Sequence, residues 1–351
     1  MIKMVMVSDI HLKQTDAWGV LENGMNSRLR DRLTSLNTAI AYAIEAKADI
    51  FYIGGDIFDK LNPSEKLRQH FVNSLVPLLE ANISIISLVG NHDTNFDVSN
   101  FGAESSIVNS IKKDAIVFIN TPTVLDLGEI KAYFVPYGAE IPKDSEGCQV
   151  LFGHCGVAGA ETGVGVIQRD GEDIDKKSFN SFKFAFLGHY HKPQKILGGS
   201  FEIIYSGSLN NWDMSERYDE KRFLEIRFEN GKTSWQSISI PDRRFMQFDF
   251  KEGESWELKD NIKDSCVKVV FHGSKEWIKA LDIDSIKRAY EGWNAHKVSI
   301  AIDVEDTKKL GALEINETDT EIDIIERYAR EKKIGKELLD IGLKIFNEGN
   351  S

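Results

Sequence analysis

Two pairs of reactive side chains stand two positions apart in the sequence, Asp9 with His11 and His189 with His191. Each pair follows an apolar run of the kind that forms a buried strand. Side chains two positions apart on an extended segment point to the same side, so each pair can present both groups together. Carboxylate and imidazole groups in this arrangement predict ligands for a divalent cation.

Further side chains of the same kind follow other predicted strands, and each group comes directly after a glycine. These residues are Asp56, the run Asn91-His92-Asp93, and His154. Ligands of open α/β sheets bind at the carboxyl ends of the strands, so we expect five strand ends to meet at one place. The glycines allow the backbone to turn sharply beneath a closely packed cluster.

A single Asp or His after a strand is more often a turn residue or a solvated group than a metal ligand. Five of the eight histidines nevertheless fall in these motifs, and only His70, His272 and His296 do not. We expect no metal role for those three. The repeated pattern indicates a site for Mn²⁺, Mg²⁺, Fe or Zn²⁺, because carboxylate, imidazole and amide ligands suit these ions.

The chain of 351 residues has a net charge of -12, which does not favour long-range attraction of nucleic acid. Carboxylates that hold cations are neutralised locally, so the total does not exclude such a partner. The three cysteines have no repeated spacing, which predicts reduced thiols in a cytoplasm. We expect neither a secretory signal nor a membrane-spanning segment, because no suitable apolar run is present.

Alternating strands and helices are predicted over residues 1–90. Strands are expected at Ile2–Ser8, Ile50–Ile53 and Ile83–Val89, with helices over Arg28–Lys47 and Pro63–Glu80 between them. This alternation implies right-handed βαβ units and a sheet covered on both faces. Later strands are expected at Ala115–Ile119, Val124–Leu127, Ile130–Val135, Gln149–Phe152, Phe184–Leu187, Glu202–Tyr205, Arg222–Phe228 and Thr233–Ser239. The predicted fold is a four-layer α/β/β/α sandwich of two packed sheets.

The expected domains are the α/β sandwich over 1–240, a small α+β domain over 241–305, and a connector with a helical tail over 306–351. The polar, acidic stretch Pro241–Asp264 marks the first boundary. A strand at Cys266–Phe271, a helix over Lys275–Glu291 and a strand at His296–Ile302 then form a β-α-β unit. Thr320–Glu348 has helical spacing with an apolar side, which favours either docking on a partner or packing on its own chain.

In order along the chain, the motifs resemble those of calcineurin-like metallophosphoesterases. They are Asp9-x-His11, Gly55-Asp56, Gly90-Asn91-His92-Asp93, Gly153-His154 and Gly188-His189-x-His191. The resemblance covers roughly residues 1–215 and implies two divalent metal ions. One ion would be held by Asp9, His11, Asp56 and His191, and the other by Asp56, Asn91, His154 and His189. Asp56 would then bridge the two ions.

The resemblance leaves His92 without a metal and facing the substrate. Two cations about 3.5–4 Å apart can share a water and lower its pKa toward neutrality. His92 is then expected to protonate the leaving 3′ alkoxide as a general acid. Asp93 has two open interpretations, because it can orient His92 and raise its pKa or cap the following turn.

Within this superfamily the chain is similar to double-strand-break repair nucleases, the SbcD subunits of bacteria and their archaeal, eukaryotic and phage counterparts. The segments that carry this likeness are Gly55-Asp56-Ile57-Phe58-Asp59 and Tyr205-Ser206-Gly207-Ser208. The capping domain and helical tail also match that architecture. The likeness implies a Mn-dependent DNA exonuclease and endonuclease, active in repair and recombination as a homodimer. An SbcC-type, SMC-like coiled-coil ATPase would bind the C-terminal helices.

Other functions remain open, because the same site serves phosphomonoesterases and cyclic-nucleotide phosphodiesterases. An architectural subunit that binds DNA ends with a dormant site is a third possibility. Leu12–Asn26, which includes Trp18, would form a wall of a DNA channel. Arg28, Arg30 and Arg32 would contact phosphates or form an ordinary solvated helix face. A chain encoded by a phage would act in the host cytoplasm.

Overall fold

The computed structural model describes residues 1–93, 116–163, 166–167, 174–257 and 260–304, and the single positions 329 and 339. The helical tail expected over Thr320–Glu348 lies outside the described residues, apart from those two positions. Residue contacts divide the chain into two compact units. The first comprises Met1–Phe248, Lys259–Val269 and Asp284–Ser299, and the second comprises Asp249–Leu258, Val270–Ile283 and Ile300–Ser351. Within the described residues no helix is long and apolar enough to cross a membrane.

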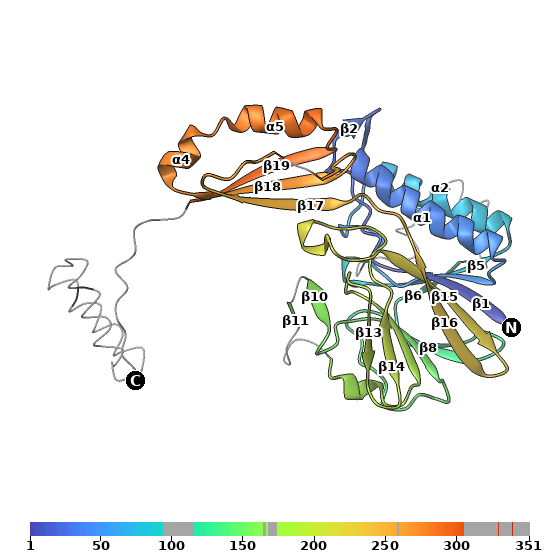
Figure 1. The fold of residues 1–351 in the computed structure, drawn as a ribbon. Coiled ribbons are helices and arrows are strands. Elements are labelled where there is room, and N and C mark those ends of the chain that lie inside the picture. The colour runs from blue at the N-terminus through green and yellow to red at the C-terminus, as the bar shows by residue number, and fades with distance from the viewer. Residues whose placement is uncertain are drawn as a thin grey trace. The chain divides into compact units, whose positions relative to one another are not determined.

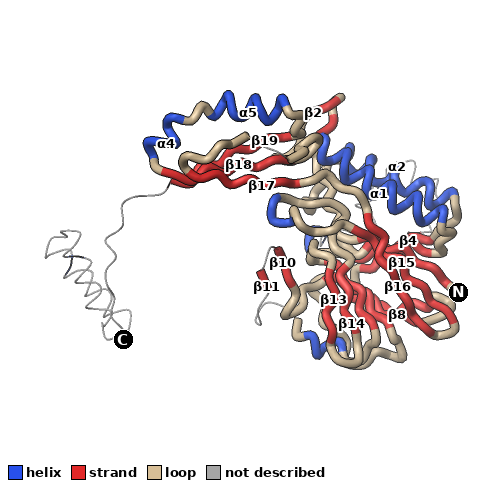
Figure 2. The backbone as a smooth tube through the Cα atoms, in the orientation of Figure 1, coloured by secondary structure: helices blue, strands red, loops and turns tan. Residues whose placement is uncertain are grey.

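A six-stranded sheet of the first unit has the order β16-β15-β1-β4-β5-β6. Its strands are β1 (Ile2–Val7), β4 (Ile50–Ile53), β5 (Ser84–Leu88), β6 (Ile116–Ile119), β15 (Arg222–Glu229) and β16 (Lys232–Ser239). The four strands from β1 to β6 run parallel, whereas β15 runs antiparallel to β1 and to β16. Helices α1 (Ser27–Glu45) and α2 (Glu65–Glu80) lie side by side and cover one face, as Figure 1 and Figure 2 show.

A second six-stranded sheet has the order β13-β14-β12-β9-β8-β7. Its strands are β7 (Thr123–Asp126), β8 (Lys131–Val135), β9 (Val150–His154), β12 (Phe184–Gly188), β13 (Gln194–Leu197) and β14 (Glu202–Tyr205). The strands β8, β9, β12 and β14 run parallel, and the two edge strands run antiparallel to their neighbours. Parallel strands in the middle of both sheets bring many carboxyl ends to a common edge.

The two sheets pack face to face through an apolar core that includes Met6, Tyr52, Phe152 and Phe186. The outer face of the second sheet packs against Phe179 of η4 (Lys176–Phe179) and nearby loop residues. The predicted α/β sandwich is therefore confirmed. Among the described residues, a 3-10 helix and loops form the fourth layer.

A three-stranded sheet follows in the chain, with the order β17-β18-β19. Its elements are β17 (Phe245–Lys251), β18 (Cys266–Gly273), α4 (Lys275–Ala280), α5 (Ile283–Gly292) and β19 (Lys297–Val304). The prediction of one helix over Lys275–Glu291 is wrong, because the structure has two helices, α4 and α5, in this region. Leu281 takes an extended conformation with ψ of 128° and ends α4. The shorter elements of the chain are β2 (Leu21–Glu22), β3 (Met25–Asn26), η1 (Asn91–Asp93), β10 (Glu161–Gly163), β11 (Val166–Ile167) and η5 (Met214–Glu216).

Candidate metal centre

Several expected ligands lie just beyond strand ends in left-handed backbone conformations. Strand β1 ends at Val7, and Asp9 and His11 follow with φ of 51° and 46°. Asp56 has φ of 53° and His189 has φ of 102°. The sequence analysis assumed that each pair lies on an extended segment, and this assumption is wrong. Asp9, His11 and His189 leave the strand direction through their positive φ angles. Such conformations persist where the surrounding contacts enforce them, and they cluster at functional sites.

Two glycines leave the space in which the cluster assembles. A β-carbon on Gly55 would lie 2.4 Å from Nδ1 of His154, and Gly55 also has a positive φ of 97°. A β-carbon on Gly90 would lie 2.2 Å from Oδ1 of Asp56. Real β-carbons do not approach so closely, so a side chain at either position would push a ligand out of place. Both glycines are therefore needed because the side chains of His154 and Asp56 pack against their α-carbons.

One group of ligand-type side chains joins Asp9 and His11 after β1 with His191 after β12. Nε2 of His191 lies 3.0 Å from Nε2 of His11. Nε2 of His11 lies 4.0 Å from Oδ1 of Asp9 and 3.5 Å from Oδ2 of Asp56. These are the four side chains that the family resemblance assigned to one ion.

A second group joins Asn91 after β5 with His154 and His189 from the second sheet. Oδ1 of Asn91 lies 3.1 Å from Nε2 of His154 and 3.0 Å from Nδ1 of His189. Nε2 of His154 is also 3.4 Å from Oδ2 of Asp56. The same Asp56 oxygen thus lies between the two groups, which is the position required of a bridging carboxylate.

The donor set fits divalent cations. Nδ1 of His154 lies 2.7 Å from the carbonyl oxygen of Gly54, and Nδ1 of His191 lies 2.7 Å from Oε1 of Glu216. These acceptors hold a proton on Nδ1 and leave each Nε2 lone pair free to bind a metal. Nδ1 of His11 is buried and has no hydrogen-bond partner among the described residues. Nε2 of His11 and Nε2 of His154 both face the Asp56 carboxylate, and each can bind a cation when it carries no proton.

The protonation of the cluster follows from burial and mutual charge. Burial and the neighbouring His191 hold the pKa of His11 well below its ordinary value, so the His11 imidazole is neutral, as a metal ligand must be. Burial also lowers the pKa of His154, but the adjacent Asp56 carboxylate outweighs it and raises that pKa to about 9. Burial raises the pKa of Asp56, yet His154 and His11 outweigh it and hold that pKa below its ordinary value. A proton on His154 therefore compensates the Asp56 charge when no cation does.

Metal affinity should fall as the pH is lowered below about 9. A cation must displace the His154 proton, so the apparent dissociation constant should rise about tenfold per pH unit through this range. The stability of the metal-free fold should change with pH in the opposite direction, falling as the pH rises. A pKa raised above 6.5 means that the ion pair stabilises the fold fully below pH 6.5 and loses this contribution as pH rises to about 9.

Two titrations check this prediction. Calorimetric metal binding and urea unfolding of chelator-treated protein would both be measured at pH 6.5 and pH 9. Tighter metal binding at pH 9, together with a less stable metal-free fold, is the expected pair of results. An affinity that does not change with pH would contradict the proton on His154.

His92 lies at the edge of the cluster and is half-buried. Its Nδ1 is 2.8 Å from the carbonyl oxygen of Asp59, and its backbone N–H donates to Oδ1 of Asp56 at 2.9 Å. Its ring meets the His11 ring edge-on, with 4.8 Å between centroids. A pocket of about 540 Å³ opens beside it, lined by Asn91 and the loop 59–62. Ligand-type atoms of His11, Asp56 and His92 also lie within 4.8 Å of one another, so His92 is close enough to the cluster to bind a metal ion or a substrate oxygen.

Asp93 contacts the backbone beneath the cluster. Its carboxylate accepts hydrogen bonds from the N–H groups of Asp56 at 2.6 Å, Ile57 at 3.3 Å and Gly90 at 3.2 Å. Burial, and then the Asp56 charge, raise its pKa to about 7. The contacts favour anchoring of the turn that carries Asp56, whereas the group that fixes the His92 ring is the Asp59 carbonyl. A direct role for Asp93 in orienting His92 remains a prediction.

Glu216 and Trp212 belong to the site but were not found from the sequence. Glu216 accepts from His191 and from Nζ of Lys221, each at 2.7 Å, and these partners outweigh burial and lower its pKa to about 2. The Trp212 ring lies 4.8 Å from the His11 ring and 5.6 Å from the His191 ring. Glu216 is at the end of η5, so the local pattern suggests only a capped turn.

Glu216→Gln should weaken metal binding by about 10- to 100-fold, which is the usual effect of removing a carboxylate partner from a ligating histidine. Glutamine still accepts a hydrogen bond from Lys221, so the effect isolates the orientation and basicity of His191. Isothermal titration with Mn²⁺ measures the loss. Glu220→Gln is the matched control, because Glu220 is exposed and lies near the same turn. Equal affinities of the two variants would remove the role of Glu216.

The three arginines at the start of α1 have a structural role. Arg28 is fully buried and pairs with Asp31 at 2.8 Å, and Arg32 is buried and pairs with Asp16 at 2.9 Å. Arg30 pairs with Glu22. A phosphate contact by Arg28 or Arg32 is therefore wrong, and a solvated position is wrong for these two side chains as well. The sequence pattern did not show this burial, because Asp16 and Asp242, the buried carboxylates beside Arg32 and Arg28, lie in separate segments of the chain.

The family model of calcineurin-like phosphoesterases matches residues 2–193, which is more than half of the chain. The chain therefore belongs to the calcineurin-like phosphoesterase family, and it is a metallophosphoesterase-type hydrolase. Two divalent ions are the cofactors of this family, and three groups of ligand-type side chains in the cluster could hold them.

Solved structures of related proteins resemble parts of the chain. An archaeal phosphodiesterase is 13% identical with a TM-score of 0.36, and the match covers 68% of this chain and 100% of that one. A dimetal phosphatase from Danio rerio is 10% identical with a TM-score of 0.44, covering 67% and 95%. A predicted phosphoesterase from Streptococcus pneumoniae is 12% identical with a TM-score of 0.29, covering 68% and 98%. Likenesses of this size do not identify a substrate.

Proposed function

We propose that the chain is a Mn²⁺-dependent DNA exonuclease and endonuclease of the SbcD-like double-strand-break repair type. One observation carries the hydrolytic part: the Asp56 carboxylate lies between two groups of ligands, with the His92 imidazole beside them. The DNA part is supported by the resemblance of residues 55–59 and 205–208 to that nuclease family.

The proposed roles of the side chains follow from their positions. Asp9, His11, Asp56 and His191 would hold one ion, and Asp56, Asn91, His154 and His189 would hold the other. Two bound ions would polarise the phosphate oxygens and lower the pKa of a shared water. Glu216 holds His191 in orientation through their 2.7 Å hydrogen bond. Asp93 anchors the turn beneath Asp56 through three backbone amides.

His92 is proposed to supply the proton for the leaving oxygen. Its Nδ1 donates to the Asp59 carbonyl, which leaves Nε2 as the nitrogen that can transfer a proton. Hydrolysis of a phosphodiester releases a sugar alkoxide, which is a poor leaving group until it is protonated. A positioned imidazole contributes typically 10² to 10⁴ in rate to such a step.

The wider assembly is proposed from the resemblance alone. We infer a homodimer in a cytoplasm, with a partner-binding tail in residues 306–351 that docks on an SbcC-type coiled-coil ATPase. Residues 241–305 would cap the site and select DNA ends.

Substrate choice tests the proposal. Linear duplex DNA, single-stranded DNA and a small aryl phosphodiester would each be incubated with Mn²⁺, Mg²⁺ or a chelator. DNA cleavage that requires Mn²⁺ and stops in chelator is expected. Turnover of the small ester without any DNA cleavage would favour the alternative, a phosphomonoesterase or cyclic-nucleotide phosphodiesterase.

A further inference from the structure

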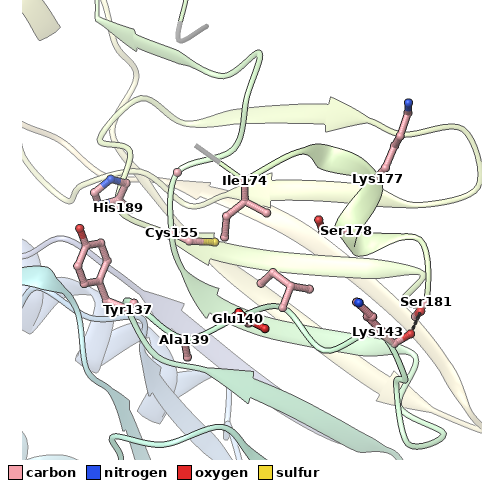
Figure 3. A pocket seen from close by; sticks show the side chains of 13 residues that line it. Tyr137, Ala139, Glu140, Lys143, Cys155, Ile174, Lys177, Ser178, Ser181 and His189 are labelled. Atoms are coloured by element: carbon pink, nitrogen blue, oxygen red, sulfur yellow. Dashed lines mark hydrogen bonds between the residues drawn. The ribbon is translucent and has the colours of Figure 1, made fainter. Parts of the chain in front are cut away.

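A cavity of about 800 Å³ opens beside the metal centre, within the first compact unit. Figure 3 shows Tyr137 and His189 together at one end and Lys143 and Lys177 toward the other. The wall between them is mostly apolar and includes Ala139, Ile141, Cys155 and Ile174. The cavity therefore runs from a metal-ligand histidine to two cationic side chains.

Tyr137 offers an open aromatic face at the metal end. Its ring centroid lies 5.7 Å from that of His189 and 6.2 Å from that of His154, and 43% of the residue is exposed. Its backbone N–H donates to the carbonyl oxygen of Val89 at 3.0 Å, so the loop after β8 is tied to the end of β5. An exposed aromatic ring beside a phosphate-processing site is suited to stack a nucleobase, because every base offers a π-face whatever the sequence.

The far end of the cavity carries positive charge. Lys143 and Lys177 are exposed, and neither forms an ion pair within the part of the chain that the structure describes. By contrast, Lys13, Lys192 and Lys221 each pair with a carboxylate. The backbone under the two cations is held in place, because Oγ of Ser181 donates to the Lys143 carbonyl at 2.7 Å and η4 carries Lys177.

Glu140 is the acidic group among the residues that line the cavity. Its negative charge repels phosphate near it, so we expect phosphates to contact Lys143 and Lys177 instead. Its carboxylate accepts hydrogen bonds and is suited to the amino groups of a base. A mostly apolar wall with a few cationic groups and one carboxylate is typical of a cavity that binds an extended, partly aromatic anion.

We propose that this cavity holds a segment of single-stranded nucleic acid next to the bond that is cleaved. One base stacks on Tyr137, and phosphates farther along the strand contact Lys143 and Lys177. The base must leave its pairing partner to reach the ring, so the occupant is a single strand and not an intact duplex. The volume lies near the upper end of the range of about 300–1,000 Å³ for small-ligand pockets, which leaves room beyond one nucleotide. The proposal rests on the proposed nuclease function and adds the path of the strand.

The test measures binding in chelator, so that no cleavage intervenes. Anisotropy of a fluorescein-labelled oligothymidylate would be recorded with the full chain over a series of KCl concentrations. Lys143→Ala/Lys177→Ala should reduce the slope of log K against log[KCl] by about 1.4, which corresponds to two phosphate contacts at about 0.7 each. The control Lys131→Ala/Lys232→Ala removes two exposed lysines outside the cavity and should retain the wild-type slope.

Tyr137 is tested by a matched pair of variants. Tyr137→Ala should weaken binding by about 10- to 100-fold, whereas Tyr137→Phe keeps the stacking face and should bind as the wild type does. Thermal midpoints check that every variant is folded.

A wild-type chain that does not bind the oligonucleotide, or a folded double lysine variant with wild-type affinity and slope, would overturn the proposal. Manganese-dependent DNA cleavage by the wild type is assayed separately. If cleavage occurs but the lysines do not matter, only the strand path is wrong. If binding depends on the lysines but no DNA is cleaved, the nuclease function is wrong and the binding site stands.

Discussion

Asp56→Ala is expected to abolish binding of both metal ions and to reduce phosphodiester hydrolysis to the background rate. Oδ2 of Asp56 lies 3.5 Å from Nε2 of His11 and 3.4 Å from Nε2 of His154, so its removal takes a ligand from both groups at once. The loss also leaves the four histidines of the two groups, His11, His154, His189 and His191, with less negative charge beside them, which disfavours a cation. Metal content after desalting, measured by mass spectrometry, should fall from two ions per chain toward none.

Thermal unfolding gives a second reading of the Asp56 variant. Mn²⁺ that binds only the folded chain raises the midpoint of the wild type by mass action, and it should not raise that of Asp56→Ala. Asp144→Ala is the control, because Asp144 is an exposed carboxylate whose hydrogen bond is to the backbone N–H of Glu146. Two tightly bound ions in Asp56→Ala would show that this carboxylate bridges nothing.

His92→Ala should keep both ions and lose about 10² to 10⁴ in the rate of DNA cleavage, the range of general acid catalysis. The ring contacts His11 and hydrogen-bonds the Asp59 carbonyl, but the proposed ligand sets are complete without it. The defect should depend on the leaving group. An aryl phosphodiester releases a stable anion that needs no proton, so its turnover should fall far less than that of DNA.

The comparison of the two substrates separates three roles for His92. A loss restricted to DNA supports the general acid. Loss of one metal ion would make His92 a ligand, as its grouping with His11 and Asp56 within 4.8 Å allows. Full activity of His92→Ala on DNA, with normal metal content, would remove the residue from the chemistry.

The fold and the clustering of the candidate ligands could be predicted because both leave local signals. Strand β4 occupies the same residues, Ile50–Ile53, as the apolar run that predicted it. Helix α2 ends at Glu80 as expected and begins at Glu65, two residues after the expected start at Pro63, because the side chain of Ser64 caps it by accepting from the N–H of Leu67. Each candidate ligand follows a strand or, like His154, ends one, and parallel strands bring their carboxyl ends together without any information from distant residues.

The remaining features depend on partners that are distant in the sequence. Glu216 is 25 residues from His191, and nothing near it signals an imidazole partner. The buried Arg28 guanidinium donates to the carbonyl oxygen of Asn211 at 2.6 Å and lies 3.6 Å from Asp242, and both partners are far from it in the chain. Strand β13 is a half-exposed edge strand and buries too little apolar surface to give a clear alternation.

Anomalous X-ray scattering from a crystal of the full chain with Mn²⁺ tests the two-metal centre most directly. Two manganese peaks about 3.5–4 Å apart are expected, one on each side of the Asp56 carboxylate. One should contact His11 and His191, and the other should contact His154 and Asn91. A single peak, or peaks that do not share Asp56, would contradict the two-metal phosphoesterase centre.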